Sequence, residues 1–132
     1  MQVRIIGSAE HPSVLLTTAP GAVDAHEGLV EPLAAVLSAA QGLTDQVRTA
    51  TFVVVCGASA AHDDAYSAAC VEGVRGITQS LALEWADRTR VNVVIASTQQ
   101  SAEATCEWLA TQRAGFVTGS TFDVRAEQWR SL

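Results

Sequence analysis

The chain has 132 residues, 48% of them hydrophobic and only 17% charged; this length allows one domain with one core, which we expect to span residues 1–132. The net charge is −6 and the eight basic residues, all arginine, are scattered, which excludes the basic patch that nucleic-acid binding requires. So apolar a composition is unusual for a small domain and predicts that part of the surface is covered by another chain.

Two short aliphatic runs at residues 2–6 and 13–17 predict two strands, separated by turn residues. The connection of six residues is too short for a parallel crossover, so we expect an antiparallel pair. Asp24 and Glu27 then have the spacing of a capping box and predict the start of a helix. Its apolar residues recur every three or four positions through about Arg48.

The remaining chain alternates between strand and helix patterns. Residues 51–56 form a continuous apolar run, which is typical of a central strand covered on both faces. Asp63 or Asp64 is expected to cap a second helix that runs to about Asp87. A strand at 90–96, a helix at 101–113 ended by Gly115, and a strand at 118–124 follow. This order predicts an α/β fold: a partial Rossmann-like, mainly parallel sheet of about five strands with flanking helices.

The cysteines and histidines do not indicate a disulfide or metal framework. The three cysteines are odd in number, lack a CxxC pair and lie in apolar or helical contexts, so we interpret them as reduced core thiols of a cytoplasmic protein. The three histidines do not stand at metal-ligand spacing, and we expect neither a metal site nor a membrane segment. These residues are Cys56, Cys70, Cys106, His11, His26 and His62.

The second half of the chain resembles the short-chain dehydrogenase/reductase family. The segment Tyr66-Ser-Ala-Ala-Cys70, residues 73–85 and residues 90–94 are similar to the catalytic helix of that family and the strand after it. Residues 113–123 match its closing segment, and residues 14–21 resemble its fourth strand. The resemblance implies a truncated, degenerate member, similar to the C-terminal half of a 3-oxoacyl reductase.

The chemistry implied by this resemblance is incomplete. Tyr66 stands at the position of the family's proton-transferring tyrosine, but the lysine one turn later is Cys70, and the chain contains no lysine. The catalytic serine belongs at the end of the central strand, where only Ser59 stands, after a short connection. The Gly-rich turn that holds a nicotinamide dinucleotide is not found. We therefore expect vestigial Tyr66 and Ser59, no catalytic residues and no cofactor.

Small residues on the two long helices predict an interface between subunits. Each helix is apolar over most of its circumference and needs cover on two sides, and in the family these helices pack against another subunit. Cover from within the chain is the alternative. Trp129 is either an anchor on a partner or folds back onto its own chain. The predicted interface comprises Ala35, Ala39, Ala69, Gly73, Gly76, Ser80, Leu83 and Trp129.

The leading hypothesis is a non-catalytic, reductase-like subunit. It assembles with an active NAD(P)H-dependent ketoreductase, a full-length short-chain reductase, or with itself, and stabilises or shapes the active partner. One alternative is a stand-alone enzyme that uses Tyr66 and His62, one turn apart on a helix. The other is a homo-oligomeric module that binds a small apolar ligand.

Overall fold

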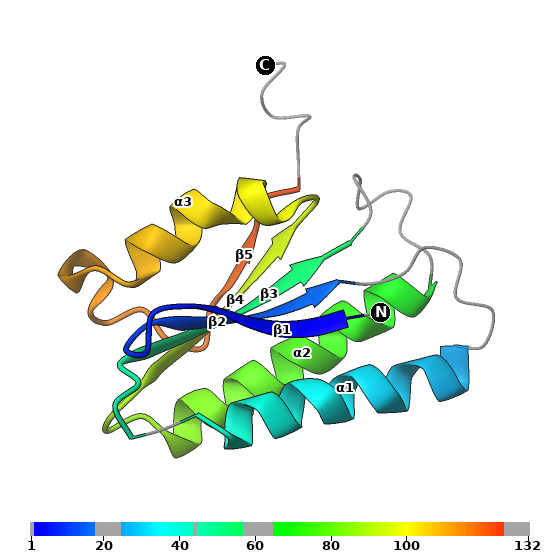
Figure 1. Cartoon of the computed structure of the whole chain (residues 1–132), viewed down its shortest axis with the longest axis horizontal. Coiled ribbons are helices and arrows are strands. Elements are labelled where there is room, and N and C mark those ends of the chain that lie inside the picture. The colour runs from blue at the N-terminus through cyan, green and yellow to red at the C-terminus, as the bar shows by residue number, and fades with distance from the viewer. Residues whose placement is uncertain (1, 18–24, 44, 57–64, 126–132) are drawn as a thin grey trace.

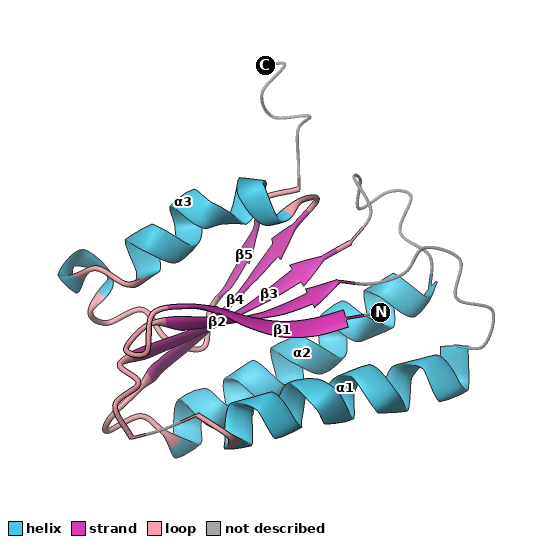
Figure 2. Ribbon diagram, viewed as in Figure 1, coloured by secondary structure: helices cyan, strands magenta, loops and turns pink. Residues whose placement is uncertain are grey.

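The computed structural model describes residues 2–17, 25–43, 45–56 and 65–125. These residues form five strands, three α-helices and a short 3₁₀ turn (Figures 1 and 2). In chain order the elements are β1 (Gln2–Gly7), β2 (Pro12–Thr17), α1 (Ala25–Gln41), β3 (Thr49–Val55), α2 (Ala65–Glu84), β4 (Arg90–Ala96), α3 (Gln99–Leu109), η2 (Gln112–Ala114) and β5 (Thr121–Asp123).

The five strands form one sheet in the order β1-β2-β3-β4-β5. β1 runs antiparallel to β2, with Val3 opposite Leu16, and every other neighbouring pair is parallel. α1 and α2 lie side by side on one face of this sheet, and α3 lies on the other (Figure 1). The predicted α/β fold with an antiparallel N-terminal strand pair is confirmed.

The core has two parts because successive strand residues point to opposite faces of the sheet. Leu16 and Val54 pack under α1 and α2 in the larger part, together with Phe52 and Val74. Leu15 and Val53 point the other way, toward α3, and form the smaller part with neighbours that include Leu109. Helices on both faces explain why the central strands are continuously apolar in sequence rather than alternating.

The first helix is shorter than predicted. It ends at Gln41, not near Arg48, and the amide of Gly42 closes its last turn by donating to the carbonyl oxygens of Ser38 and Ala39 at 3.1 and 3.2 Å. Val47 is still buried, from the loop that leads into β3. The apolar periodicity therefore continues past the end of the helix, because it follows the burial of the side chains and not the helix itself.

The last helix and strand also differ from the prediction. α3 begins at Gln99, because the Thr98 side chain accepts a hydrogen bond from the Ser101 amide, and it ends at Leu109. β5 begins only at Thr121, since Asn92 of β4 holds the segment before it: its Nδ2 donates to the Val117 carbonyl oxygen and its Oδ1 accepts from the Ser120 amide, both at 3.0 Å.

The predicted caps Asp24, Asp63 and Asp64 lie outside the described residues. Within the described part of the chain, every helix is too short or too polar to cross a bilayer.

Candidate functional site

The residues that the sequence assigns to vestigial chemistry belong to the start of α2 and to the segment that precedes it in the sequence. Tyr66 is in the first turn of α2, and Cys70 follows one turn later. The Cys70 side chain has no exposed surface (0%). Ser59 and His62 lie outside the described residues. The position that carries a lysine in the family is thus part of the core beneath α2.

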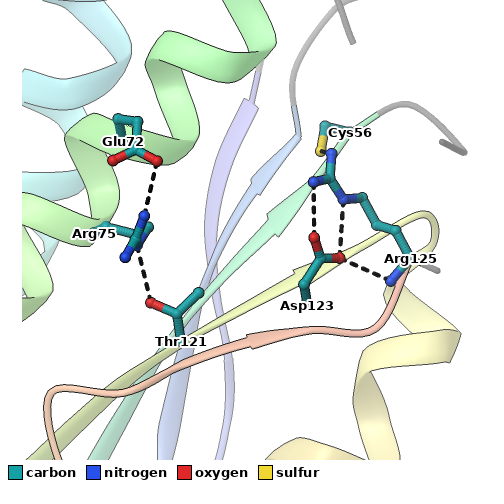
Figure 3. A network of polar contacts seen from close by, with 6 residues as sticks. All are labelled: Cys56, Glu72, Arg75, Thr121, Asp123 and Arg125. Carbon is teal, nitrogen blue, oxygen red and sulfur yellow. Dashed lines mark hydrogen bonds and ion pairs between the residues drawn. The ribbon is translucent and has the colours of Figure 1, made fainter. Parts of the chain in front are cut away.

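A polar network lies where the parallel strands end. In a doubly wound fold this carboxyl edge of the sheet is where ligands bind. Arg125, after β5, is only 6% exposed and forms a two-pronged contact with Asp123. Its Nε lies 3.0 Å from Oδ1 and its Nη2 lies 2.9 Å from Oδ2 (Figure 3). The Arg125 amide donates to Oδ1 at 3.0 Å, and Nη1 donates to the sulfur of Cys56, just after β3, at 3.3 Å.

The hydrogen bonds of this network favour the ionised form of Asp123. Hydrogen bonds from the Arg125 side chain hold the pKa of the Asp123 carboxyl below its usual range, against the opposing effect of partial burial. Two parallel N–H···O contacts also fix the plane of the guanidinium. The contact with Cys56 connects the segment after β5 to the end of β3. The ion pair of Arg125 and Asp123 therefore occupies this part of the edge.

Sequence reasoning missed Arg125 because it considered the arginines only as scattered residues that form no basic patch. A usable signal was present: Asp123 and Arg125 stand two residues apart at the end of the closing strand. A second arginine, Arg75 of α2, donates to Thr121 of β5 at 3.1 Å and to Glu72 at 2.8 Å (Figure 3). It links the helix to the edge strand from a half-buried position.

The second candidate region is the outer face of α1 and α2. Leu83 is 83% exposed and Leu37 is 40% exposed, although both are large and apolar. A hollow of about 390 Å³ lies between the helices, and Leu37, Gly76 and Ser80 are among the residues that line it. The other predicted interface residues Ala35, Ala39 and Ala69 are half-buried on the same helices. Trp129 lies outside the described residues.

The two glycines of this face have different surroundings. A Cβ on Gly73 would lie 2.6 Å from Cδ1 of Leu33, so this glycine allows α1 and α2 to approach closely within the chain. Beyond its chain neighbours and the backbone of its own helix, a Cβ on Gly76 would have no atom within 4 Å. Close packing inside the chain therefore explains Gly73, whereas Gly76 opens onto the hollow.

A metal centre has no donors in the parts of the chain that the structure describes, since no three His, Cys, Asp or Glu side chains gather there. The three cysteines form no disulfide; Cys56 and Cys70 are buried and Cys106 is partly so.

A doubly wound α/β layer, with its ligand edge at the ends of the parallel strands, defines the general class of this protein. Residues 20–124 match the model of the SDR-like family, described as short chain dehydrogenase-like protein. The chain belongs to this family, as the resemblance in its second half predicted.

Comparison with solved structures supports the same fold. The chain is similar to a “putative short chain dehydrogenase from Escherichia coli CFT073”, with a TM-score of 0.51 and 22% sequence identity. The match covers 74% of this chain and 47% of that one, so this chain spans about half the length of the solved relative. Comparison with curated proteins finds no match.

Proposed function

We propose that this chain is a non-catalytic subunit of a short-chain reductase assembly. It joins a full-length, NAD(P)H-dependent ketoreductase, or a second copy of itself, through the outer face of α1 and α2. The observation that carries the proposal is the contrast at α2: Cys70 is wholly buried at the position where the family has its lysine, while Gly76 and Leu83 on the same helix face outward.

Burial of Cys70 argues against a proton relay. In the family, the lysine lowers the pKa of the tyrosine and contacts the cofactor ribose, which requires an ammonium group in the active site. A side chain with no exposed surface on α2 does not reach such a site. Tyr66 would then have no lysine to assist its proton transfer, because the chain contains none.

The described residues do not fit a nicotinamide dinucleotide. β1 lies antiparallel beside β2, on the side where a doubly wound fold places the parallel strand that leads into the Gly-rich turn. The guanidinium of Arg125 lies against Cys56 at the end of β3, within the ligand edge. We therefore expect no heat of binding when the isolated chain is titrated with NADH or NADPH. Micromolar binding of either would contradict this part of the proposal.

The outer face of α1 and α2 has the features of an assembly surface. It combines exposed leucines with small side chains and a hollow, which together allow another helix to approach closely. Exposed apolar side chains that gather around a hollow can mark the site where a partner binds. A partner that binds only the folded chain stabilises it by mass action, and the partner gains in the same way.

Co-expression of the tagged chain with a full-length short-chain reductase from the same organism tests the proposal. We expect the two to purify together and the melting temperature or ketone turnover of the reductase to change. Gly76→Arg should abolish co-purification, whereas Gln79→Arg, which adds the same charge at an exposed position of α2, should not. Co-purification that survives Gly76→Arg would remove this face as the interface.

A small-ligand module is the second candidate function. The observation that favours it is a cavity between α3 and the sheet, on the face opposite α1 and α2. The alternative of a stand-alone enzyme that uses Tyr66 and His62 has no supporting observation in the described residues.

A further inference from the structure

A cavity of about 210 Å³ lies between α3 and the strands β1, β2 and β3. Its walls are mostly apolar and include Leu15 and Val53 on the strand side and Ala102 on the helix side. A cavity of about 150 Å³ accommodates a benzene ring. The space under α3 is therefore sufficient for one ring with a short substituent chain.

Thr51 of β3 presents a buried hydroxyl to this cavity. The residue lines the cavity and is only 5% exposed, yet its hydroxyl has no hydrogen-bond partner among the described residues. Its polar neighbours are satisfied: Thr49 contacts the ring of His11, and Ser13 shares a hydrogen bond with the thiol of Cys106. A buried hydroxyl without a partner is destabilising, so a polar group of a ligand would satisfy it.

Two carboxylates line the helix side of the same cavity. Glu103 and Glu107 are one turn apart on α3, so their charges repel one another. Neither forms an ion pair with any residue that the structure describes. Arg4 is near α3, but its Nη2 donates to Oε1 of Gln99 at 2.9 Å. The two charges are thus available to a cation.

The remaining titratable groups at the cavity do not neutralise these carboxylates. His11 lies with its Nε2 3.9 Å from Glu10, on the strand side. The pKa of the Cys106 thiol is raised, first by burial and further by Glu103 and Glu107, which keeps the thiol neutral. The cavity therefore combines an apolar interior with a negative rim and one unsatisfied hydroxyl.

We propose that this cavity binds a small protonated amine with an aromatic or apolar body and a second hydrogen-bonding group. The ammonium lies between Glu103 and Glu107, the body packs against Leu15 and Val53, and the second polar group contacts the Thr51 hydroxyl. The site is on the face of the sheet opposite α1 and α2, so it operates whether or not the chain assembles through those helices.

Tyramine is a suitable probe, because it has an ammonium at one end and a phenol at the other. Titration of the ¹⁵N-labelled full chain should give saturable shifts at the amides of Thr51, Ala102 and Ala110. The matched anion, 3-(4-hydroxyphenyl)propionate, has the same shape with a carboxylate in place of the amine and should give none. Glu103→Gln and Glu107→Gln should each weaken tyramine binding about 5- to 10-fold. Glu72→Gln, on α2, should leave it unchanged.

The role of Thr51 is tested by comparing two ligands, tyramine and 2-phenylethylamine, in the wild type and in Thr51→Val. 2-Phenylethylamine lacks the phenol hydroxyl. The wild type should bind tyramine about 5-fold more tightly than 2-phenylethylamine, and Thr51→Val should remove that difference. The same variant should raise the melting temperature of the free chain by about 3 °C, because the unpaired hydroxyl is gone.

Three results would overturn the proposal. These are the absence of saturable shifts with tyramine, equal binding of tyramine and the matched anion, and a preference for tyramine that persists in Thr51→Val. A fall in melting temperature for Thr51→Val would assign the hydroxyl a structural role and remove it from the site.

Discussion

The carboxyl edge of the sheet and the outer face of α1 and α2 differ in how far their side chains are exposed. At the described part of the edge Arg125 is buried and paired with Asp123, and Cys70, near the start of α2, has no exposed surface. The outer helix face has an exposed Leu83, an open Gly76 and a hollow. An enzyme of this fold needs an open edge, and this difference is the basis of our proposal that the chain serves in assembly rather than catalysis.

The strongest test of the closed edge is to put the family's lysine back. Cys70→Lys would place an ammonium in the core beneath α2, and we expect the free energy of unfolding to fall by about 4 kcal/mol or more. Ketone reduction with NADPH should remain undetectable. Chemical denaturation and a turnover assay measure the two effects, and Cys70→Ala controls for loss of the thiol. A folded, active Cys70→Lys variant would mean that the edge is open after all.

The Asp123–Arg125 pair is the next test. Asp123→Asn leaves a buried guanidinium without its carboxylate, and we expect a loss of about 2 kcal/mol at pH 7, reduced from the full cost of breaking a buried pair because Asp123 is 40% exposed. The matched control is Asp45→Asn, which removes the exposed partner of Arg88 and should leave stability unchanged.

The pH dependence gives the same pair a second readout. Because the pKa of Asp123 is lowered in the folded chain, its contribution is present above the unfolded value of about 4 and is lost as the pH falls through the folded pKa. Denaturation midpoints of the wild type should therefore fall more steeply below about pH 4 than those of Asp123→Asn. Parallel curves for the two proteins would show that the pair contributes nothing.

Two glycine variants sharpen the description of the helix face with a smaller effect. Gly73→Ala forces a Cβ against Leu33, and we expect a net loss of about 1 kcal/mol after the gain in helix propensity. Gly76→Ala meets no atom and should stabilise the isolated chain by up to about 1 kcal/mol. Thermal unfolding of the monomer at low concentration separates the two. Equal effects would mean that the glycines do not differ in their surroundings.

The sheet was predictable from sequence because its signals are local. Continuous apolar runs identified the central strands, and the short connection between the first two runs required them to be antiparallel. The helix ends were not predictable from the sequence. Val47 continues the apolar spacing of α1 although it lies beyond the turn at Gly42. The late start of β5 depends on Asn92, which is distant in sequence.

Much less of the candidate site was predictable. The resemblance identified Cys70 as a replacement for lysine, but its burial depends on how α2 packs on the sheet. The different roles of Gly73 and Gly76 depend on the position of Leu33, on another helix. The cavity under α3 brings together residues from four elements, and no spacing in the sequence relates Thr51 to Glu103 and Glu107.

The most direct test of assembly through α1 and α2 is the mass of the protein in solution. Light scattering coupled to size exclusion should be run on the wild type, Gly76→Arg and Gln79→Arg, each alone and after co-expression with a full-length short-chain reductase from the same organism. The account predicts a mass above that of one 13.8 kDa chain for the wild type and Gln79→Arg, in at least one of the two settings, and a folded 13.8 kDa species for Gly76→Arg in both. A wild type that is monomeric in both settings, or a Gly76→Arg variant with unchanged mass and partner, would contradict it.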